Sequence, residues 1–360
     1  MRRQLVAVIA GLFVLSFTAC SNGGGNEASG GGGSSGSGCG TMRFVFSPDP
    51  VWNWLEDQGI LNQMQQESGC QIQRYESEDE FAFFAGGHAD IVSTGSYETP
   101  VLESEAKVQT VTIGKYNMAK DIVVVAADKP WNSFGDLPKG CKVGEESFSG
   151  SSIVWQALAK DIDGRTLAQN SDDLQMVLAD FDVGPGLVLK GDLCAATTSI
   201  YDSLTLLKEG KVKGLYDNKS ASQLYAEKYA PGHQGMNSNN FVVLKSWYDD
   251  HPNEVAFFLK VWQRGLDEWA NNKDAILKAY PDDFGYKNAD ELAFLENWYQ
   301  TQFDEFVDSV YLDEDWINGE AKVVDLLKGA NLVGQDQQQP LHVCIDPSSG
   351  EQTCSIPSGA

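Results

Sequence analysis

The chain has 360 residues and a formal net charge of −25, from 51 acidic and 26 basic side chains. Nucleic-acid backbones are bound by clustered lysine and arginine, so this charge excludes nucleic acid as a partner. Seven cysteines and four histidines are present, with no CxxC pair and no cluster at zinc-ligand spacing, so we expect neither a metal site nor a cofactor.

The N-terminus has the pattern of an export signal. A short positive segment is followed by an almost unbroken apolar run over residues 5–17, which is too short to span a bilayer but typical of a secretory signal core. The run ends in Phe-Thr-Ala-Cys at 17–20, which resembles the lipobox of bacterial lipoproteins, whose cysteine receives a diacylglycerol. This resemblance implies a signal peptide at 1–20, lipid attachment at Cys20 and an extracytoplasmic, membrane-anchored protein. A plain signal cut elsewhere would leave Cys20 an ordinary thiol.

A flexible tether separates this signal from the folded part. Residues 21–40 are almost wholly Gly, Ser and Asn, which bury no surface. About 320 residues follow, enough for two lobes of ordinary domain size. No later stretch approaches about 18 consecutive apolar residues, so we expect no further membrane span.

The first part of the folded region alternates between strand and helix patterns. Strands are expected at 42–47, 71–75 and 89–93, with helices at 51–67 and 81–84. This alternation predicts a right-handed parallel βαβ sheet.

The pattern then repeats further along the chain. Strands are expected at 121–127, 142–144, 174–179 and 192–197, with a helix at 149–160. A second alternating set of this kind predicts a second α/β sheet.

One segment occurs twice. Residues 84–97 and 187–201 each contain a helix end, a glycine, an aspartate, an apolar strand, then Ser or Thr and a tyrosine. Two copies of one unit indicate two similar lobes.

The last part is mainly helical. After a strand at 241–244, helices are expected at 252–271, 289–307 and 315–328. Tryptophans occur in these segments at helical spacing among Leu and Phe, so we expect them to pack in the core.

Three motifs follow one another between residues 42 and 280. The segment 86–92 reads GGHADIV, the segment 129–144 contains KPWNSFGDLPKG followed by KVG, and the segment 251–265 begins HPNEV and ends RG. Their order and spacing resemble the periplasmic binding proteins for nitrate, sulfonates and thiamine-precursor pyrimidines, which serve ABC transporters.

This resemblance implies a fold and a partner. The expected fold is α/β and two-lobed, of the type II periplasmic-binding-protein kind, each lobe a mainly parallel sheet flanked by helices and joined by two crossing strands. Lobe 1 is expected at 41–121 plus 237–335, lobe 2 at 122–236, and a C-terminal tail with a cysteine-closed hairpin at 336–360. The ligand would lie in the cleft between the lobes and be delivered to an ABC transporter permease by a monomer.

Six cysteines remain after Cys20, and an even number in an exported chain indicates disulfides. The family's sheet order makes neighbours of the strands beside four of them, so the resemblance implies two pairs. The other two flank the turn sequence 346–350, which predicts a closed hairpin. The expected pairs are Cys39–Cys70, Cys141–Cys194 and Cys344–Cys354.

The loops past the expected strand ends are the expected ligand contacts, because open α/β sheets bind ligands there. These loops are aromatic and polar and hold several carboxylates, but no lysine or arginine. A sulfonate or carboxylate is normally bound by an arginine fork. The loops therefore favour a neutral or cationic heterocycle, such as a thiamine-precursor pyrimidine, held on aromatic faces. The candidate ligand-binding residues are Asp49, Trp52, Thr94, Ser96, Tyr97, Glu98, Ser147, Ser149, Ser151, Thr198, Tyr201 and Asn239.

Four of these residues have predicted roles. Tyr97 and Trp52 are the stacking candidates, and Asp49 and Glu98 would accept hydrogen bonds from amino or ammonium groups. Tyr97 is favoured over Trp52 because it follows a strand end and has a counterpart in Tyr201 of the other lobe. The two tyrosines could sandwich a ring on closure.

An oxyanion remains the alternative ligand. The serine-rich start of the helix at 149–160 could bind a sulfonate, taurine or nitrate through its backbone N–H groups, although serines there also cap helices. No nucleophile–base pair and no metal cluster assembles, so we do not expect an enzyme. The sequence predicts an extracytoplasmic solute-binding lipoprotein of an ABC importer, in the periplasm or on the outer face of the membrane. A sensor lobe of the same fold is the other reading.

Overall fold

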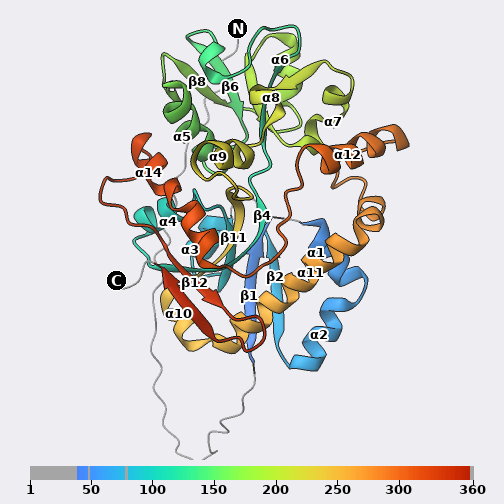
Figure 1. Cartoon of the computed structure of the whole chain (residues 1–360), viewed down its shortest axis with the longest axis vertical. Coiled ribbons are helices and arrows are strands. Elements are labelled where there is room, and N and C mark those ends of the chain that lie inside the picture. Colours follow the sequence, from blue (N-terminus) through green and yellow to red (C-terminus); the bar gives the residue numbers. More distant parts are fainter. Residues whose placement is uncertain (1–38, 48, 78–79, 357–360) are drawn as a thin grey trace, which may run out of the picture. The chain divides into compact units, whose positions relative to one another are not determined.

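The computed structural model describes residues 39–47, 49–77 and 80–356, apart from the side chains of Phe81 and Ala82 (Figure 1). The predicted signal peptide, the lipid anchor at Cys20 and most of the tether lie outside these ranges. No helix among the described residues is long and apolar enough to cross a membrane.

Seven strands form the first sheet, in the order β13-β12-β4-β11-β3-β1-β2. The strands β2, β1 and β3 run parallel, and β11 runs antiparallel to both β3 and β4. The strand bounds are β1 (Thr41–Phe46), β2 (Gln71–Glu76), β3 (Ile91–Thr94), β4 (Thr110–Met118), β11 (Asn237–Leu244), β12 (Leu341–Ile345) and β13 (Gln352–Ile356).

Six strands form the second sheet, in the order β10-β5-β9-β6-β8-β7. Strands β9, β6, β8 and β7 are parallel, and β5 is antiparallel to both of its neighbours. The bounds are β5 (Ile122–Ala126), β6 (Cys141–Glu145), β7 (Leu167–Ala168), β8 (Leu174–Leu178), β9 (Ala195–Thr198) and β10 (Val212–Gly214).

Both sheets share one arrangement, which confirms the predicted α/β fold. A central strand is flanked by two parallel neighbours, as β2-β1-β3 in one sheet and β8-β6-β9 in the other. The chain leaves the first sheet after β4 and returns with β11, so these two strands are the crossings. We call the first sheet with its helices lobe 1 and the second sheet with its helices lobe 2. The doubled sequence segment lies at equivalent places, across α3 and β3 in one lobe and α6 and β9 in the other.

Helices cover both sheets (Figure 1). Those encoded within lobe 1 are α1 (Pro50–Asp57), α2 (Ile60–Ser68), α3 (Glu80–Ala85), α4 (Thr99–Ala106), α10 (Lys245–Asp250) and α11 (Pro252–Ala279). Those encoded within lobe 2 are α5 (Ser151–Asp163), α6 (Gly184–Lys190), α7 (Ile200–Lys208), α8 (Leu215–Asn218) and α9 (Ala221–Tyr229). The last three are α12 (Ala289–Thr301), α13 (Glu314–Glu320) and α14 (Lys322–Gly329).

Several element predictions need correction. The single helix expected at 51–67 is two helices, because Gly59 adopts the left-handed conformation with φ 70° and separates α1 from α2. The helix expected at 315–328 is likewise divided, between α13 and α14. The strand β4 and the helices α4, α7 and α9 were not predicted.

The lobe assignment of the last helices also differs from the expectation. The sequence placed residues up to 335 with lobe 1, yet α14 packs on α5 and α12 packs on α7, both in lobe 2. The tail is not separate either, because β12 pairs with β4 and extends the first sheet. The sequence reveals an amphipathic helix but not which surface that helix covers.

The three predicted disulfides are present in the structure. The Cα–Cα distances are 4.8 Å for Cys39–Cys70, 5.8 Å for Cys141–Cys194 and 4.8 Å for Cys344–Cys354. The last pair joins directly opposite residues of the β12–β13 hairpin. Each pair bridges neighbouring or paired strands, as the family's sheet order and the turn sequence implied.

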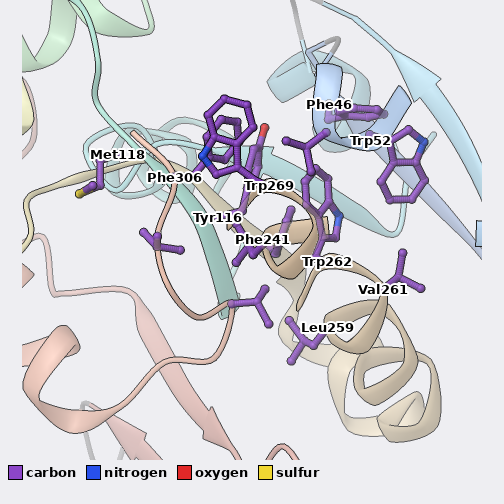
Figure 2. Close-up of a cluster of buried hydrophobic side chains, with 14 of the residues drawn as sticks. Phe46, Trp52, Tyr116, Met118, Phe241, Leu259, Val261, Trp262, Trp269 and Phe306 are labelled. Carbon is purple, nitrogen blue, oxygen red and sulfur yellow. The ribbon is translucent and has the colours of Figure 1, made fainter. Parts of the chain in front are cut away.

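An aromatic cluster forms the centre of lobe 1 (Figure 2). Trp262 of α11 stacks on Tyr116 of β4, with ring centroids 4.3 Å apart, and contacts Phe241 of β11 at 5.0 Å. Trp52 of α1 lies 5.3 Å from Trp262 on its other side. Both tryptophans of α11, Trp262 and Trp269, therefore pack in the core, as their helical spacing predicted.

Candidate functional site

A cavity of about 370 Å³ opens past the carboxyl ends of strands from both sheets. Ser47 follows β1, Glu146 follows β6 and Ser199 follows β9. The cavity therefore lies past the carboxyl ends of these strands, which is where open α/β sheets bind their ligands. We call it the interlobe cavity. Its lining residues are Ser47, Asp49, Pro50, Lys120, Asp121, Glu146, Phe181, Ser199, Tyr201, Asp202, Asp283, Glu305 and Phe306.

A larger hollow of about 860 Å³ lies elsewhere, between the return loop 229–234 and α13. It is not at the carboxyl ends of the central parallel strands. For that reason the smaller interlobe cavity is the better candidate for a solute site.

Asp49 lies deep in the interlobe cavity and also caps α1. Its Oδ1 accepts hydrogen bonds from the backbone N–H groups of Val51 and Trp52, at 2.8 and 3.3 Å. The side chain is only 6% exposed, and burial raises its pKa to about 6, partly opposed by the charge of Lys120. The cap fixes the carboxylate at the wall of the cavity.

Tyr201 lies at the start of α7. Its hydroxyl group is held by two residues that follow α11 in the sequence, Tyr299 and Glu305. Its hydroxyl lies 2.6 Å from the Tyr299 hydroxyl and donates a short hydrogen bond to Glu305. Glu305 is 2% exposed, and burial raises its pKa. Because its hydroxyl is bound to a buried carboxylate and to a second hydroxyl, the ring of Tyr201 is fixed in orientation at the cavity wall.

Lys120 and Asp121 enter the cavity from the crossing between β4 and β5. The Lys120 Nζ lies over the ring of Tyr201, 4.8 Å from its centroid. Burial raises the pKa of Asp121 to about 6, and the charge of Lys120 opposes that rise. The crossing thus supplies a lysine and an aspartate to the lining, neither of which was among the predicted ligand-binding residues.

The cavity is strongly acidic. Its lining holds six carboxylate side chains and one lysine. Asp49 and Glu305 are buried, whereas Glu146, Asp202 and Asp283 are exposed. Such a wall attracts cations and repels anions. The described lining contains no histidine and no cysteine.

Lys120, Asp283, Glu305 and Phe306 are among the lining residues that sequence reasoning missed. The first lies one residue before the expected strand at 121–127, so a search of the crossings as well as the loops would have found it. The other three lie in irregular segments on either side of α12. No sequence pattern linked those segments to the cavity.

The structure corrects the role predicted for Trp52. Its side chain is fully buried between Phe46 and Trp262, and its indole N–H donates to Glu56 at 2.9 Å (Figure 2). It does not line the interlobe cavity. The side chain points to the core because the apolar face of α1 packs on α11.

The predicted pair of facing tyrosines is not formed around the interlobe cavity. Tyr97 is 3% exposed, packs in the apolar cluster that includes Ile153 of α5, and lies 3.4 Å from the Ser238 hydroxyl through its own hydroxyl. Only Tyr201 lines the cavity. Tyr97 instead joins lobe 1 to lobe 2 by apolar contact.

Several other candidates do not line the interlobe cavity and form hydrogen bonds within the chain. Ser96 donates to Glu320 at 2.9 Å, and Asn239 donates to the Ser93 hydroxyl at 2.7 Å. Thr94 donates to Glu98 at 3.2 Å, and Thr198 donates to the carbonyl of Phe181 at 3.0 Å. Each of these side chains has a hydrogen-bond partner within the chain, which its position near a strand end alone could not reveal.

Glu98 lies at the serine-rich start of α5. Its carboxylate accepts hydrogen bonds from the Gly95 N–H at 2.7 Å and from the N–H of Gly150, the residue that precedes α5. Burial raises its pKa. A carboxylate of the chain itself thus occupies the helix start where an oxyanion ligand was the alternative prediction.

The serines at this helix start have mainly local partners. Ser147 donates to the carbonyl of Ser149 at 2.7 Å, and the Ser149 hydroxyl lies 3.4 Å from that of Ser147. Ser151 forms a hydrogen bond with Asp121. Only the last of these three contacts reaches a residue of the interlobe cavity.

A buried carboxyl beneath the cavity makes stability depend on pH. Glu145, at the end of β6, is fully buried, accepts a hydrogen bond from Thr197 at 2.8 Å, and has a pKa raised by burial to about 8. Because the folded-state pKa lies above the unfolded value of 4.5, its contribution to stability is present at acid pH and is lost as the pH rises towards 8. We expect Glu145→Gln, which stays neutral, to flatten this decline when urea midpoints are compared at pH 5 and pH 9. The exposed Glu67→Gln is the control and should leave the decline unchanged; equal profiles for wild type and Glu145→Gln would contradict the expectation.

Comparison with solved structures places the chain by fold. It is similar to the periplasmic aliphatic sulphonate binding protein SsuA from Escherichia coli, with a TM-score of 0.61 and 14% identity over 83% of this chain and 90% of that chain. It is also similar to a Candida albicans protein described as having the generic periplasmic binding protein structural fold, with a TM-score of 0.57 and 12% identity over 82% and 92% of the two chains. The desulfurization enzyme DSZB is similar too, with a TM-score of 0.52 and 12% identity over 83% and 95%.

No protein-family model and no curated protein sequence matches the chain. The similarity to solved structures shows that the chain has the periplasmic-binding-protein fold. Its structural relatives with this fold include both a binding protein and an enzyme. Because fold does not determine function, the residues of the cavity must carry that argument.

Proposed function

We propose that this chain is the solute-binding component of an ABC importer and that its ligand is a small neutral or cationic molecule, such as a heterocycle with an amino or ammonium group. The observation that carries the proposal is the interlobe cavity, with six carboxylates and one lysine past the carboxyl ends of the strands. The similar fold of a periplasmic binding protein supports the transport role. Capture between two lobes would give the permease a closed surface that differs from the empty one.

Three features support a cation over an oxyanion. The carboxylates of the cavity favour positive charge by simple electrostatics. Glu98 already accepts a hydrogen bond from the residue before α5, so an anion there would compete with a tethered carboxylate. The lining holds aromatic side chains, Phe181, Tyr201 and Phe306, on which an apolar ring or cation can pack.

A sulfonate is the second candidate ligand. The similar protein from Escherichia coli is described as an aliphatic sulphonate binding protein, and Lys120 offers one positive charge in the cavity. A ligand such as taurine also carries an ammonium group, which the carboxylates would accept. A binding experiment must therefore separate net charge from the type of anionic group.

The test is calorimetry on the mature chain with an aminopyrimidine, choline, taurine and nitrate, for wild type and Asp49→Asn. Asparagine also caps helices, so this substitution removes the charge while keeping the cap of α1. We expect a cationic ligand to bind wild type and to bind Asp49→Asn at least about tenfold more weakly, a loss of about 1.4 kcal/mol.

The matched control is Asp313→Asn, which removes the charge of another helix-capping aspartate, on α13 and outside the interlobe cavity. Its affinities should equal those of wild type. Tight binding of nitrate or taurine with no effect of Asp49→Asn would replace the proposed ligand by an oxyanion, and no binding by any compound would remove the transport role.

The anchor belongs to the same proposal. Lipid attachment at Cys20 would hold the binding protein at the membrane beside its permease, and the tether would let it reach the transporter. A monomer that works outside the cytoplasm and carries out no catalysis fits this role. The second hypothesis is that the chain is a sensor lobe, which would use the same cavity but act on a signalling partner instead of a permease.

A further inference from the structure

Lys120 is a cation that the chain itself places inside the interlobe cavity. Its Nζ lies over the face of Tyr201, 4.8 Å from the ring centroid. Among the described lining residues it is the one basic side chain, and its charge acts on Asp49, Asp121 and Glu305. The ammonium group thus lies over an aromatic face and acts electrostatically on three carboxylates of the same lining.

The ring under Lys120 is held in place independently of the lysine. The Tyr201 hydroxyl donates to Glu305 and lies 2.6 Å from the Tyr299 hydroxyl. Phe284 packs edge-on against the same ring at 5.5 Å. The aromatic face would therefore remain in position if the ammonium of Lys120 moved away, and an aromatic face beside carboxylates is a site for an alkylammonium group.

We propose that, in the absence of ligand, the ammonium group of Lys120 takes the place of the ligand's own cation. It occupies a cation subsite formed by the face of Tyr201 and the carboxylates of Asp49, Asp121 and Glu305. A ligand with an alkylammonium group would take this place and displace the lysine side chain. The inference rests on the proposed function in one respect, namely that the interlobe cavity is the solute site.

The inference names the chemical class of the ligand and gives Lys120 a role in specificity. A cation must compete with the lysine, so weakly charged or poorly fitting cations are excluded from the subsite. The opposite role for Lys120 is an anchor for the anionic group of a ligand such as taurine. The two roles predict opposite effects of removing the lysine charge.

The experiment uses Lys120→Ala and ethylammonium chloride, which has the shape of the removed end of the lysine. We expect ethylammonium to raise the melting temperature of Lys120→Ala in a saturable way, relative to sodium chloride at equal ionic strength. Calorimetry should give at least about tenfold tighter ethylammonium binding than for wild type, equivalent to about 1.4 kcal/mol. Lys120→Ser, which also leaves the space of the lysine side chain open, provides the same comparison if the alanine variant does not fold.

Lys213→Ala is the control, because the Nζ of Lys213 contacts the Asn132 side chain and lies outside the cavity. It should respond to ethylammonium as wild type does. An equal response of both variants would overturn the inference. Loss of taurine binding in Lys120→Ala would also overturn it and make Lys120 an anion anchor.

These outcomes are separable from those of the proposed function. If wild type binds a cationic solute but Lys120→Ala gains no affinity for ethylammonium, the proposed role of Lys120 fails and the solute-binding role survives. If Lys120→Ala binds ethylammonium while wild type binds no solute of the panel, the cation subsite stands and the transport role fails.

Discussion

Trp262→Ala is expected to lower the free energy of unfolding by about 3–5 kcal/mol, the usual cost of removing a large buried aromatic side chain. Trp262 is fully buried and touches rings from α1, β4 and β11. Its removal leaves a cavity bounded by three separate elements, so no single neighbour can move to fill it. Urea unfolding followed by circular dichroism measures the change.

Trp247→Ala is the matched control for that loss. Trp247 is only partly buried on α10 and stacks on His251, with ring centroids 4.4 Å apart. A tryptophan at the surface leaves no enclosed cavity when it is truncated, so its loss should be clearly smaller. Similar losses for the two variants would show that the aromatic cluster is not the stabilising centre of lobe 1.

Replacing Cys141 and Cys194 together by alanine is expected to destabilise the chain by about 4 kcal/mol, from the loop entropy that the disulfide removes from the unfolded state. The two cysteines are 53 residues apart, the longest of the three closed loops. The bridge joins β6 to the residue before β9, the central pair of the second sheet. Thermal unfolding without reductant measures the effect.

The hairpin disulfide serves as the comparison. Cys344 and Cys354 are separated by only 10 residues, so their replacement should cost about 3 kcal/mol on the same argument. Peptide mapping under non-reducing conditions should first recover all three pairs from the wild type. A larger loss from the hairpin pair than from the Cys141–Cys194 pair would contradict the loop-entropy order.

The local patterns of the chain predicted much of the fold. Alternating strand and helix segments predicted two α/β sheets, and the doubled segments at Tyr97 and Tyr201 correctly indicated two similar lobes. These signals are reliable because burial periodicity and turn residues act within a few residues of each other. The helix break at Gly59 was not predicted, because residues that favour helices lie on both sides of this single glycine.

The site was predicted only in part. Asp49 and Tyr201 line the interlobe cavity, whereas Trp52 is in the core and Tyr97 lies between the lobes outside that cavity. Residue type and loop position could not separate the residues that line the cavity from those that pack in the core. A side chain near a strand end can point either into the cavity or into the core. Lys120 was missed because the strand before it was missed.

The sequence by itself determined the α/β class and the acidic character of the chain, since each depends on composition or on short-range pattern, whereas two of the three cysteine pairs were implied by the family resemblance. The tertiary structure alone decided which carboxylates converge. Asp49, Asp121 and Glu305 are distant in sequence and share one cavity, because the β4–β5 crossing and the segment after α12 meet past the end of β1. Long-range packing brings these carboxylates together at a cost in desolvation that no local sequence pattern records, and their convergence makes the interlobe cavity acidic.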